Sequence, residues 1–224
     1  MPFLTGRFDA DAAMLDDALH PRENFDLMKR SFRIADRPAA IYCIDVFIKS
    51  IAVDKVLTAL MGLTPKDLRE LTDPAAFSER HIPHTEVSCE QDGSLAVLAA
   101  LSGMLVLLID GYDHAFLLDL RQYPSRAISE PEDDRVLRGA HDGFSENVKV
   151  NVALMRRRIR DPHFRAESVR VGWKSQTDIV LCYLDGVADP AIVERMRETL
   201  RAIRIPSLSM GYESSSGNLQ GASG

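Results

Sequence analysis

The sequence has few cysteines, and none of them forms a CxxC pair. Cys43, Cys89 and Cys182 are the three present, and they lie far apart. An odd number of widely spaced cysteines is typical of reduced thiols in a cytosol-like compartment, and argues against a disulfide framework. Cys43 and Cys182 lie inside apolar runs, so we predict that both are core residues.

Long hydrophobic runs are also absent. The longest apolar stretch covers residues 95–109 and is interrupted by Ser102 and Gly103. It is shorter than the roughly 18 residues needed to span a bilayer. The first 20 residues contain Arg7 and several aspartates but no apolar core of a signal peptide. We therefore predict a chain that is soluble as it stands and carries no secretion signal.

An excess of positive charge is missing as well. The 224 residues carry a net charge of -6 and have a pI of about 5.5. Proteins that bind nucleic acid are usually basic, so we predict no nucleic-acid partner. The hydrophobic content of 46% and charged content of 27% are typical of a globular protein with a core. The length suits one large domain or two small ones.

Motifs of catalytic and metal sites are lacking. We find no nucleophile elbow and no Ser/Lys or Cys/His arrangement. His81, His84, Glu86 and Cys89 are metal-ligand types at close spacing, but Pro83 breaks any regular helix there and no second cluster matches them. We expect no metal, no cofactor and no enzymatic activity. A hydrolase or transferase would need a nucleophile and a tuned base, and the sequence shows neither.

The pattern of apolar residues predicts an α/β fold, because buried strands alternate with amphipathic helices. The predicted strands cover residues 39–45, 84–89, 104–110, 115–120, 169–173 and 178–185. The predicted helices cover residues 10–19, 53–61, 94–101 and 144–160. Two more begin at Pro65, with Thr64 as the cap, and at Pro190. The strands at 104–110 and 115–120 are joined by Gly-Tyr-Asp-His, which indicates a hairpin.

The predicted architecture has two small α/β subdomains, each with a short mixed β-sheet packed by helices. Residues 1–36 form an N-terminal segment, residues 37–126 the first subdomain and residues 127–210 the second, which holds the long Arg-rich helix. Residues 211–224 are low in apolar side chains and are predicted to be a flexible tail, which resembles an added linker more than part of a fold.

A weak internal repeat supports two related units. Residues 40–45 and residues 180–185 are both apolar strands that end in aspartate and precede an amphipathic helix, and their offset is 140 residues. Chance similarity between strand–helix units is the alternative. Asp45, Asp110 and Asp185 each follow an apolar strand, where α/β folds place sites and where turn or cap acids are also common.

Glycine and charged residues are most densely combined in residues 130–162, which read EPEDDRVLRGAHDGFSENVKVNVALMRRRIRDP. Gly139 and Gly143 precede the helix predicted at 144–160, so its start could hold an anion on free N–H groups. The other interpretation is a tight turn with Asp142 as the helix cap.

The predicted helix ends in Arg156, Arg157, Arg158 and Arg160, which point in different directions because successive residues differ by about 100°. These arginines form a solvated face, ion pairs with the acids of residues 130–134, or a basic surface for lipid head groups or a partner protein.

The same stretch resembles the signature of the spore germination proteins of the GerA A-subunit and SpoVAF family. The matching positions are Glu130, Pro131, Arg138, Gly139, Asp142, Gly143, Phe144, Glu146, Asn151, Arg156, Arg157, Arg158 and Ile159. Residues 105–111, 119–126, 171–179 and 183–203 also resemble family segments, so the similarity covers about residues 25–210. Ala140, His141 and Val46 depart from the family pattern, and the end of the chain is closer to the SpoVAF branch.

The resemblance implies the N-terminal domain of a multi-pass protein of the spore inner membrane, facing the spore core. Such proteins are germinant receptor subunits or accessories that promote ion release. The resemblance therefore implies other germination membrane proteins as partners, with self-association also possible.

Two further hypotheses concern how the domain works. In the first, the acidic linker and the arginine helix form a switchable interface in which Glu130 and Arg138 pair, and Gly139 and Gly143 allow close packing or positive φ. In the second, a cleft between the subdomains near Asp45, Asp110 and Asp185 binds a small molecule, such as a germinant.

Overall fold

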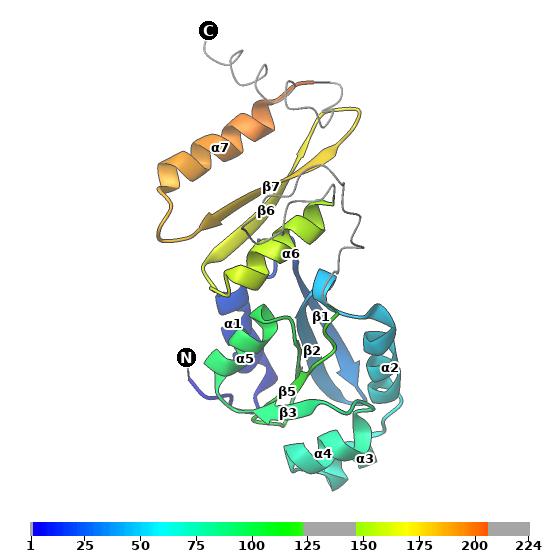
Figure 1. Ribbon diagram of the computed structural model, residues 1–224. Coiled ribbons are helices and arrows are strands. Elements are labelled where there is room, and N and C mark those ends of the chain that lie inside the picture. The colour runs from blue at the N-terminus through cyan, green and yellow to red at the C-terminus, as the bar shows by residue number, and fades with distance from the viewer. Residues whose placement is uncertain (1, 123–146, 206–224) are drawn as a thin grey trace, which may run out of the picture. The chain divides into compact units, whose positions relative to one another are not determined.

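The structure is a computed structural model that describes residues 2–122 and 147–205 (Figure 1). The chain divides into two compact units. Unit 1 comprises Met1–Arg22 and Asp26–Pro162, and unit 2 comprises Glu23–Phe25 and His163–Gly224. The helix at the end of the signature stretch therefore belongs with the first unit, whereas the sequence placed it in a second subdomain that starts at residue 127.

A five-stranded sheet forms the centre of unit 1, with the strand order β1-β2-β4-β5-β3. Each neighbouring pair is antiparallel, and Ala40 of β2 lies opposite Leu108 of β4. The strands are β1 (Leu27–Ile34), β2 (Arg37–Ile44), β3 (Val87–Glu90), β4 (Leu105–Ile109) and β5 (Ala115–Leu118). The α/β class is confirmed, and the pairing is antiparallel where the sequence suggested mixed sheets.

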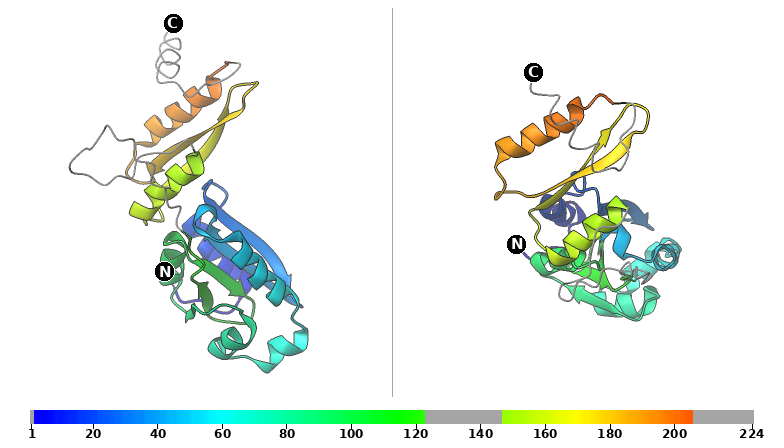
Figure 2. Two further views of the ribbon diagram at one scale, coloured as in Figure 1. Left: turned by 45° about the vertical axis from the view of Figure 1, so that its right-hand side comes forward. Right: turned by 45° about the horizontal axis from the view of Figure 1, so that its top comes forward.

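Helices cover both faces of this sheet, as Figures 1 and 2 show. Since side chains alternate along a strand, Ile41 and Cys43 pack on one face with α2, while Ala40 and Tyr42 pack on the other with α1 and α5. Both faces of β2 and β4 are thus buried, which explains their continuous apolar runs. The helices are α1 (Phe8–Leu19), α2 (Ser50–Met61), α3 (Pro65–Glu70), α4 (Pro74–His81) and α5 (Gly93–Leu101).

The local signals for helix starts work well in unit 1. Thr64 caps α3 in a capping box with Asp67, and Pro65 occupies the first turn, as predicted. Asp73 and Asp92 cap α4 and α5 by accepting backbone N–H groups of Ala76 and Ser94. These caps satisfy N–H groups that have no partner inside the helix.

Unit 2 is built from a β-hairpin and one helix. β6 (Phe164–Val171) pairs antiparallel with β7 (Thr177–Leu184), and α7 (Pro190–Ala202) packs on β6. Trp173, which the sequence placed in a strand, lies in the turn between β6 and β7. Asp189 caps α7, and Pro190 is its first residue, as predicted.

A short piece of chain from far upstream completes unit 2. Phe25 N donates to Ala166 O at 2.8 Å, and Asn24 Oδ1 accepts from Ala166 N at 2.9 Å. Asn24 is 3% exposed. Residues 23–25 therefore satisfy backbone groups along β6, which a two-stranded sheet would leave open.

The internal repeat has a structural counterpart. Each half has an antiparallel pair of eight-residue strands followed by a helix: β1, β2 and α2 in unit 1, and β6, β7 and α7 in unit 2. Asp45 N donates to Asp26 O, and Asp185 N donates to His163 O, so both aspartates extend their strand pair in the same way. The two units share a strand–strand–helix plan.

Candidate functional site

The signature stretch is described from Asn147 onward, where it forms α6 (Val148–Arg158). Asn147 is the N-cap, because its Oδ1 accepts from Lys149 N at 2.9 Å and from Val150 N at 3.4 Å. Asn147 rather than Asp142 therefore caps this helix, which starts four residues later than predicted. The predicted residues Glu130, Arg138, Gly139, Asp142, Gly143, Phe144 and Glu146 lie outside the described residues, as do the predicted linker and tail.

One face of α6 packs into unit 1. Val152, Ala153 and Arg156 are buried on this face, at spacings that bring them to one side of a helix. Ala153 contacts Ile44 and Phe47, the latter in the short 3-10 helix η1 (Asp45–Phe47) that follows β2. The sequence spacing of Phe144, Val148, Val152, Met155 and Ile159 predicts one apolar stripe on this helix. Val152 is buried, as this predicts, whereas Val148, Met155 and Ile159 are half-buried.

Arg156 forms a buried ion pair with Asp26, the residue before β1. Its Nε lies 2.9 Å from Asp26 Oδ2 and its Nη2 lies 3.0 Å from Asp26 Oδ1, and both side chains are 0% exposed. This two-point contact uses the planar fork of the guanidinium, which Lys could not reproduce. The pair fixes α6 to the start of the sheet, since Asp26 O also accepts from Asp45 N.

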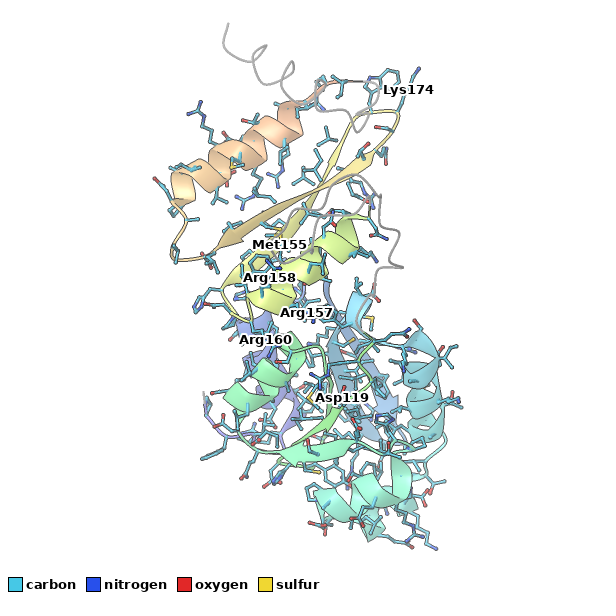
Figure 3. All side chains as sticks on the ribbon, in the orientation of Figure 1. Asp119, Met155, Arg157, Arg158, Arg160 and Lys174 are labelled. Carbon is cyan, nitrogen blue, oxygen red and sulfur yellow. The ribbon has the colours of Figure 1, made fainter. Side chains whose placement is uncertain are left out.

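The remaining arginines of the cluster are on the surface. Arg157, Arg158 and Arg160 are exposed, and Figure 3 labels them. A turn of about 100° per residue carries Arg157 and Arg158 away from the packed face, and Arg160 lies beyond the end of α6. Asn151 is half-buried. The triplet is thus divided into one structural arginine and two exposed ones.

A second, weaker contact joins α6 to the end of β2. Lys149 Nζ lies 3.0 Å from Asp45 Oδ2, and the two side chains are 49% and 51% exposed. A solvent-exposed pair of this kind contributes about 0–1 kcal/mol. This ion pair contributes more to the orientation of α6 than to the stability of the fold.

The three aspartates after the strands have structural contacts. Asp45 pairs with Lys149, Asp110 Oδ1 accepts from Phe8 N at 3.1 Å, and Asp185 pairs with Arg165 at 3.1 Å. Cap and ion-pair roles of this kind are the commoner ones for such positions.

Asp45 and Asp110 lie at opposite ends of the sheet of unit 1. Asp110 N bonds to Pro38 O, and Asp45 is seven residues further along β2. At about 3.3 Å per residue the two aspartates are separated by about 23 Å. These two carboxylates are therefore too far apart to bind one small molecule together, and the hypothesis of a cleft between the subdomains stays a prediction.

His81 and His84, which are metal-ligand types at close spacing, have other contacts. His84 Nε2 lies 2.9 Å from Asp119 O, and the His81 ring lies 5.2 Å from the Phe77 ring. In residues 2–122 and 147–205 no group of three or more His, Cys, Asp or Glu side chains has the geometry to hold a metal ion.

Cys43 is a core residue, as predicted. It is 0% exposed, and burial together with the nearby charge of Asp45 raises the pKa of its thiol to about 12. A thiol of this kind stays protonated and unreactive at neutral pH. Cys182 is only half-buried, and Cys43, Cys89 and Cys182 form no disulfide with one another.

A polar network joins α7 to the β6–β7 sheet of unit 2. Glu167 of β6 accepts from Arg197 Nε and Nη2, both at 2.9 Å, and from the Tyr183 hydroxyl. Burial alone would raise the pKa of Glu167, but the hydrogen bonds from Arg197 and Tyr183 outweigh it and lower the pKa. Burial and the bond to Glu167 raise the pKa of Tyr183 to about 12.

This network predicts an acid sensitivity of unit 2. A carboxyl whose pKa is lowered in the folded state stabilises the protein fully above its ordinary pKa of 4.5, and the stabilisation is lost as the pH falls through the folded value. We expect Glu167→Gln to lower the urea midpoint of unit 2 at pH 7 and to flatten its decline below pH 4.5. The midpoint is read from the fluorescence of Trp173, the single tryptophan, which lies in unit 2. Glu198→Gln, exposed on α7, is the control, and an equal shift in both variants would contradict the prediction.

Sequence reasoning missed the residues that hold the site together. Asp26 lies in a stretch with no recognised element, 130 residues before Arg156. Asn24, Glu167 and Arg197 carried no motif either. The only available signal was the three consecutive arginines, which do not reveal that the first is buried.

Comparison with known proteins places these features in a family. The family model described as Bacillus/Clostridium GerA spore germination protein matches residues 13–213. Stage V sporulation protein AF of Bacillus subtilis is 32% identical over 189 residues, which cover 84% of this chain and 38% of that protein. Spore germination protein KA of Bacillus subtilis is 29% identical over 135 residues, which cover 60% of this chain and 25% of that protein. The chain thus spans well under half the length of these relatives.

The fold also matches a solved structure. The N-terminal domain of the A subunit of the Bacillus megaterium spore germinant receptor GerK3 aligns with a TM-score of 0.68 and 23% sequence identity, over 90% of this chain and 74% of that one. Among the described residues, no helix has the length and apolar character needed to span a membrane.

Proposed function

The chain belongs to the GerA spore germination protein family, and we propose that it acts as an assembly and signalling domain of a germination complex in the spore inner membrane. Its fold is that of the N-terminal domain of the A subunit of a germinant receptor. Relatives include stage V sporulation protein AF and a Bacillus subtilis protein, YfkQ, described as a membrane protein. In this proposal the domain is non-catalytic, and it faces the spore core, where its three cysteines stay reduced.

The division of the arginine triplet carries the proposal. Arg156 forms the buried ion pair with Asp26, and this pair fixes the orientation of α6. The same helix turn then presents Arg157 and Arg158 on the surface of unit 1 at a defined position. Charged side chains held on a rigid helix give orientation and specificity to a protein interface. The exposed arginines of α6 are therefore the surface that we assign to a partner subunit.

Reversing these two charges is expected to impair assembly without unfolding the domain. Arg157→Glu combined with Arg158→Glu in the full-length protein places two negative charges where the partner meets two positive ones. Like charges across an interface cost several kcal/mol, so we expect at least about a tenfold loss of the complex. The measurement is quantitative co-purification of the tagged protein with the other germination membrane proteins from spores.

The control reverses an equal charge elsewhere on unit 1. Lys66 and Arg69 of α3 are 82% and 74% exposed, so Lys66→Glu with Arg69→Glu changes the net charge identically. We expect this variant to assemble normally. Circular dichroism melts of the 224-residue chain check that both variants fold. Unchanged assembly of the Arg157/Arg158 variant, or an equal loss in the control, would sink the proposal.

A further inference from the structure

The turn between β6 and β7 in unit 2 exposes the single tryptophan of the chain. We call residues 172–176 the hairpin tip. Trp173 is 63% exposed, and Lys174, Ser175 and Gln176 are exposed beside it. Lys174 Nζ lies 4.9 Å from the centre of the Trp173 ring, and Figure 3 shows Lys174 at the end of the hairpin. A large aromatic side chain in such a position gains nothing from the core of its own unit.

The hairpin tip has a defined conformation. Gln176 N bonds to Gly172 O at 3.1 Å, and Gly172 has a φ of +84°, which glycine adopts without strain. Trp173 N donates to Ile205 O at 3.1 Å, which ties the tip to the segment that follows α7. The tryptophan is therefore presented by an ordered turn, close to the end of α7.

Positive charge gathers at this end of unit 2, although the chain as a whole has a net charge of -6. Lys174, Arg201 and Arg204 are exposed. Arg204 adjoins Ile205, which bonds to Trp173, and Arg201 lies about one helical turn earlier. Arg170 is also near the tip, but Asp178 pairs with it at 3.4 Å.

We propose that the hairpin tip binds the surface of an anionic lipid bilayer, with Trp173 at the level of the head groups and the three cations against their phosphates. The indole is apolar with one N–H donor, and tryptophan gathers at membrane–water interfaces for this reason. Basic side chains near an anionic leaflet each add about 1 kcal/mol of attraction, or about a fivefold gain in partition.

The surroundings of Trp173 favour a lipid surface over a protein partner. The core of a protein interface is apolar and depleted in lysine. Among the described residues of the hairpin tip, the neighbours of Trp173 at positions 174–176 are Lys174, Ser175 and Gln176, which are all polar and exposed. A bilayer interface requires only the ring and the cations.

Trp173 fluorescence tests this directly, because no other tryptophan contributes. The 224-residue chain is titrated with vesicles of equal parts phosphatidylglycerol and phosphatidylcholine at low salt. We expect a blue shift of the emission and protection from iodide quenching, both reversed by added salt. Vesicles of phosphatidylcholine alone are expected to give neither.

Variants separate the tip from the rest of the chain. Lys174→Gln with Arg204→Gln is expected to lower the partition to anionic vesicles about 25-fold, at about fivefold per cation. Trp173→Ala, followed by co-sedimentation, is expected to lower it as well. Lys66→Gln with Arg69→Gln removes the same charge from α3 of unit 1 and is expected to bind like the parent protein. Circular dichroism melts confirm that each variant folds.

Four outcomes would overturn the proposal. The first is no spectral shift with anionic vesicles, and the second is equal partition of the Lys174/Arg204 variant and the α3 control. The third is the same shift with inorganic phosphate alone, and the fourth is a shift that grows with protein concentration in the absence of vesicles. The third would indicate a phosphate site, and the fourth a contact with a second copy of the chain.

Discussion

Asp26→Ala is expected to lower the free energy of unfolding of unit 1 by about 3–5 kcal/mol. The substitution removes the Asp26 carboxylate, and the two hydrogen bonds that it accepts, from the Arg156 guanidinium, which is 0% exposed. A buried charge bears a large penalty for leaving water, and this ion pair offsets part of that penalty. A loss of this size is a large part of the total stability of a typical domain.

The measurement is urea unfolding followed by far-ultraviolet circular dichroism, which reports on unit 1 and unit 2 together. Trp173 fluorescence reports on unit 2 alone, so the two signals separate the units if they do not unfold in one step. Asp45→Ala is the matched control, because it removes an aspartate that pairs with α6 on the surface. It is expected to lower stability by less than about 1 kcal/mol. Equal losses of unfolding free energy in the two variants would show that the buried ion pair stabilises unit 1 no more than the exposed one does.

Phe77→Ala is expected to lower the stability of unit 1 by a similar amount, about 3–5 kcal/mol. Phe77 is 0% exposed and is the core residue of α4. Its ring centre lies 4.9 Å from that of Tyr112 and 5.5 Å from that of Phe116. The truncation removes these ring contacts and leaves a cavity beneath a helix of only eight residues, which has few other anchors.

Phe3→Ala is the matched control for this second variant. Phe3 is 65% exposed, so the same truncation is expected to change stability by no more than about 0.5 kcal/mol. Urea unfolding by circular dichroism measures both. A small effect of Phe77→Ala would mean that α4 separates from the sheet without unfolding the rest of unit 1, and amide hydrogen exchange would then show low protection in residues 74–81.

The parts of the fold that were predictable are those with strong local signals. β2 and β4 are buried on both faces, so each is a continuous apolar run that no polar residue interrupts. Helix α3 was recognised from Thr64 and Pro65 because capping chemistry depends only on neighbouring residues. The strand–strand–helix plan shared by the two units appeared in the sequence as a repeat of strand and aspartate.

The parts that were missed depend on distant residues or on position in the sheet. β1 is an edge strand that carries Lys29, Arg30 and Arg33, so its composition reads as a polar segment. The burial of Arg156 follows from Asp26, which no local pattern connects to it. The start of α6 was predicted too early because Gly143 and Asp142 looked like a turn and a cap, while Asn147 has that role.

Residues 23–26 are synthesised long before the residues that they contact, and this order has a consequence for the biogenesis of the protein. Asn24 and Phe25 leave the ribosome long before Ala166, and Asp26 leaves it 130 residues before Arg156. At about 5–20 residues per second, these residues wait about 7–28 s for their partners. Neither unit can be completed from the N-terminal half of the chain alone. Nascent chains that stop before α6 therefore expose the Asp26 carboxylate and residues 24 and 25, without Arg156 and Ala166, to chaperones and proteases.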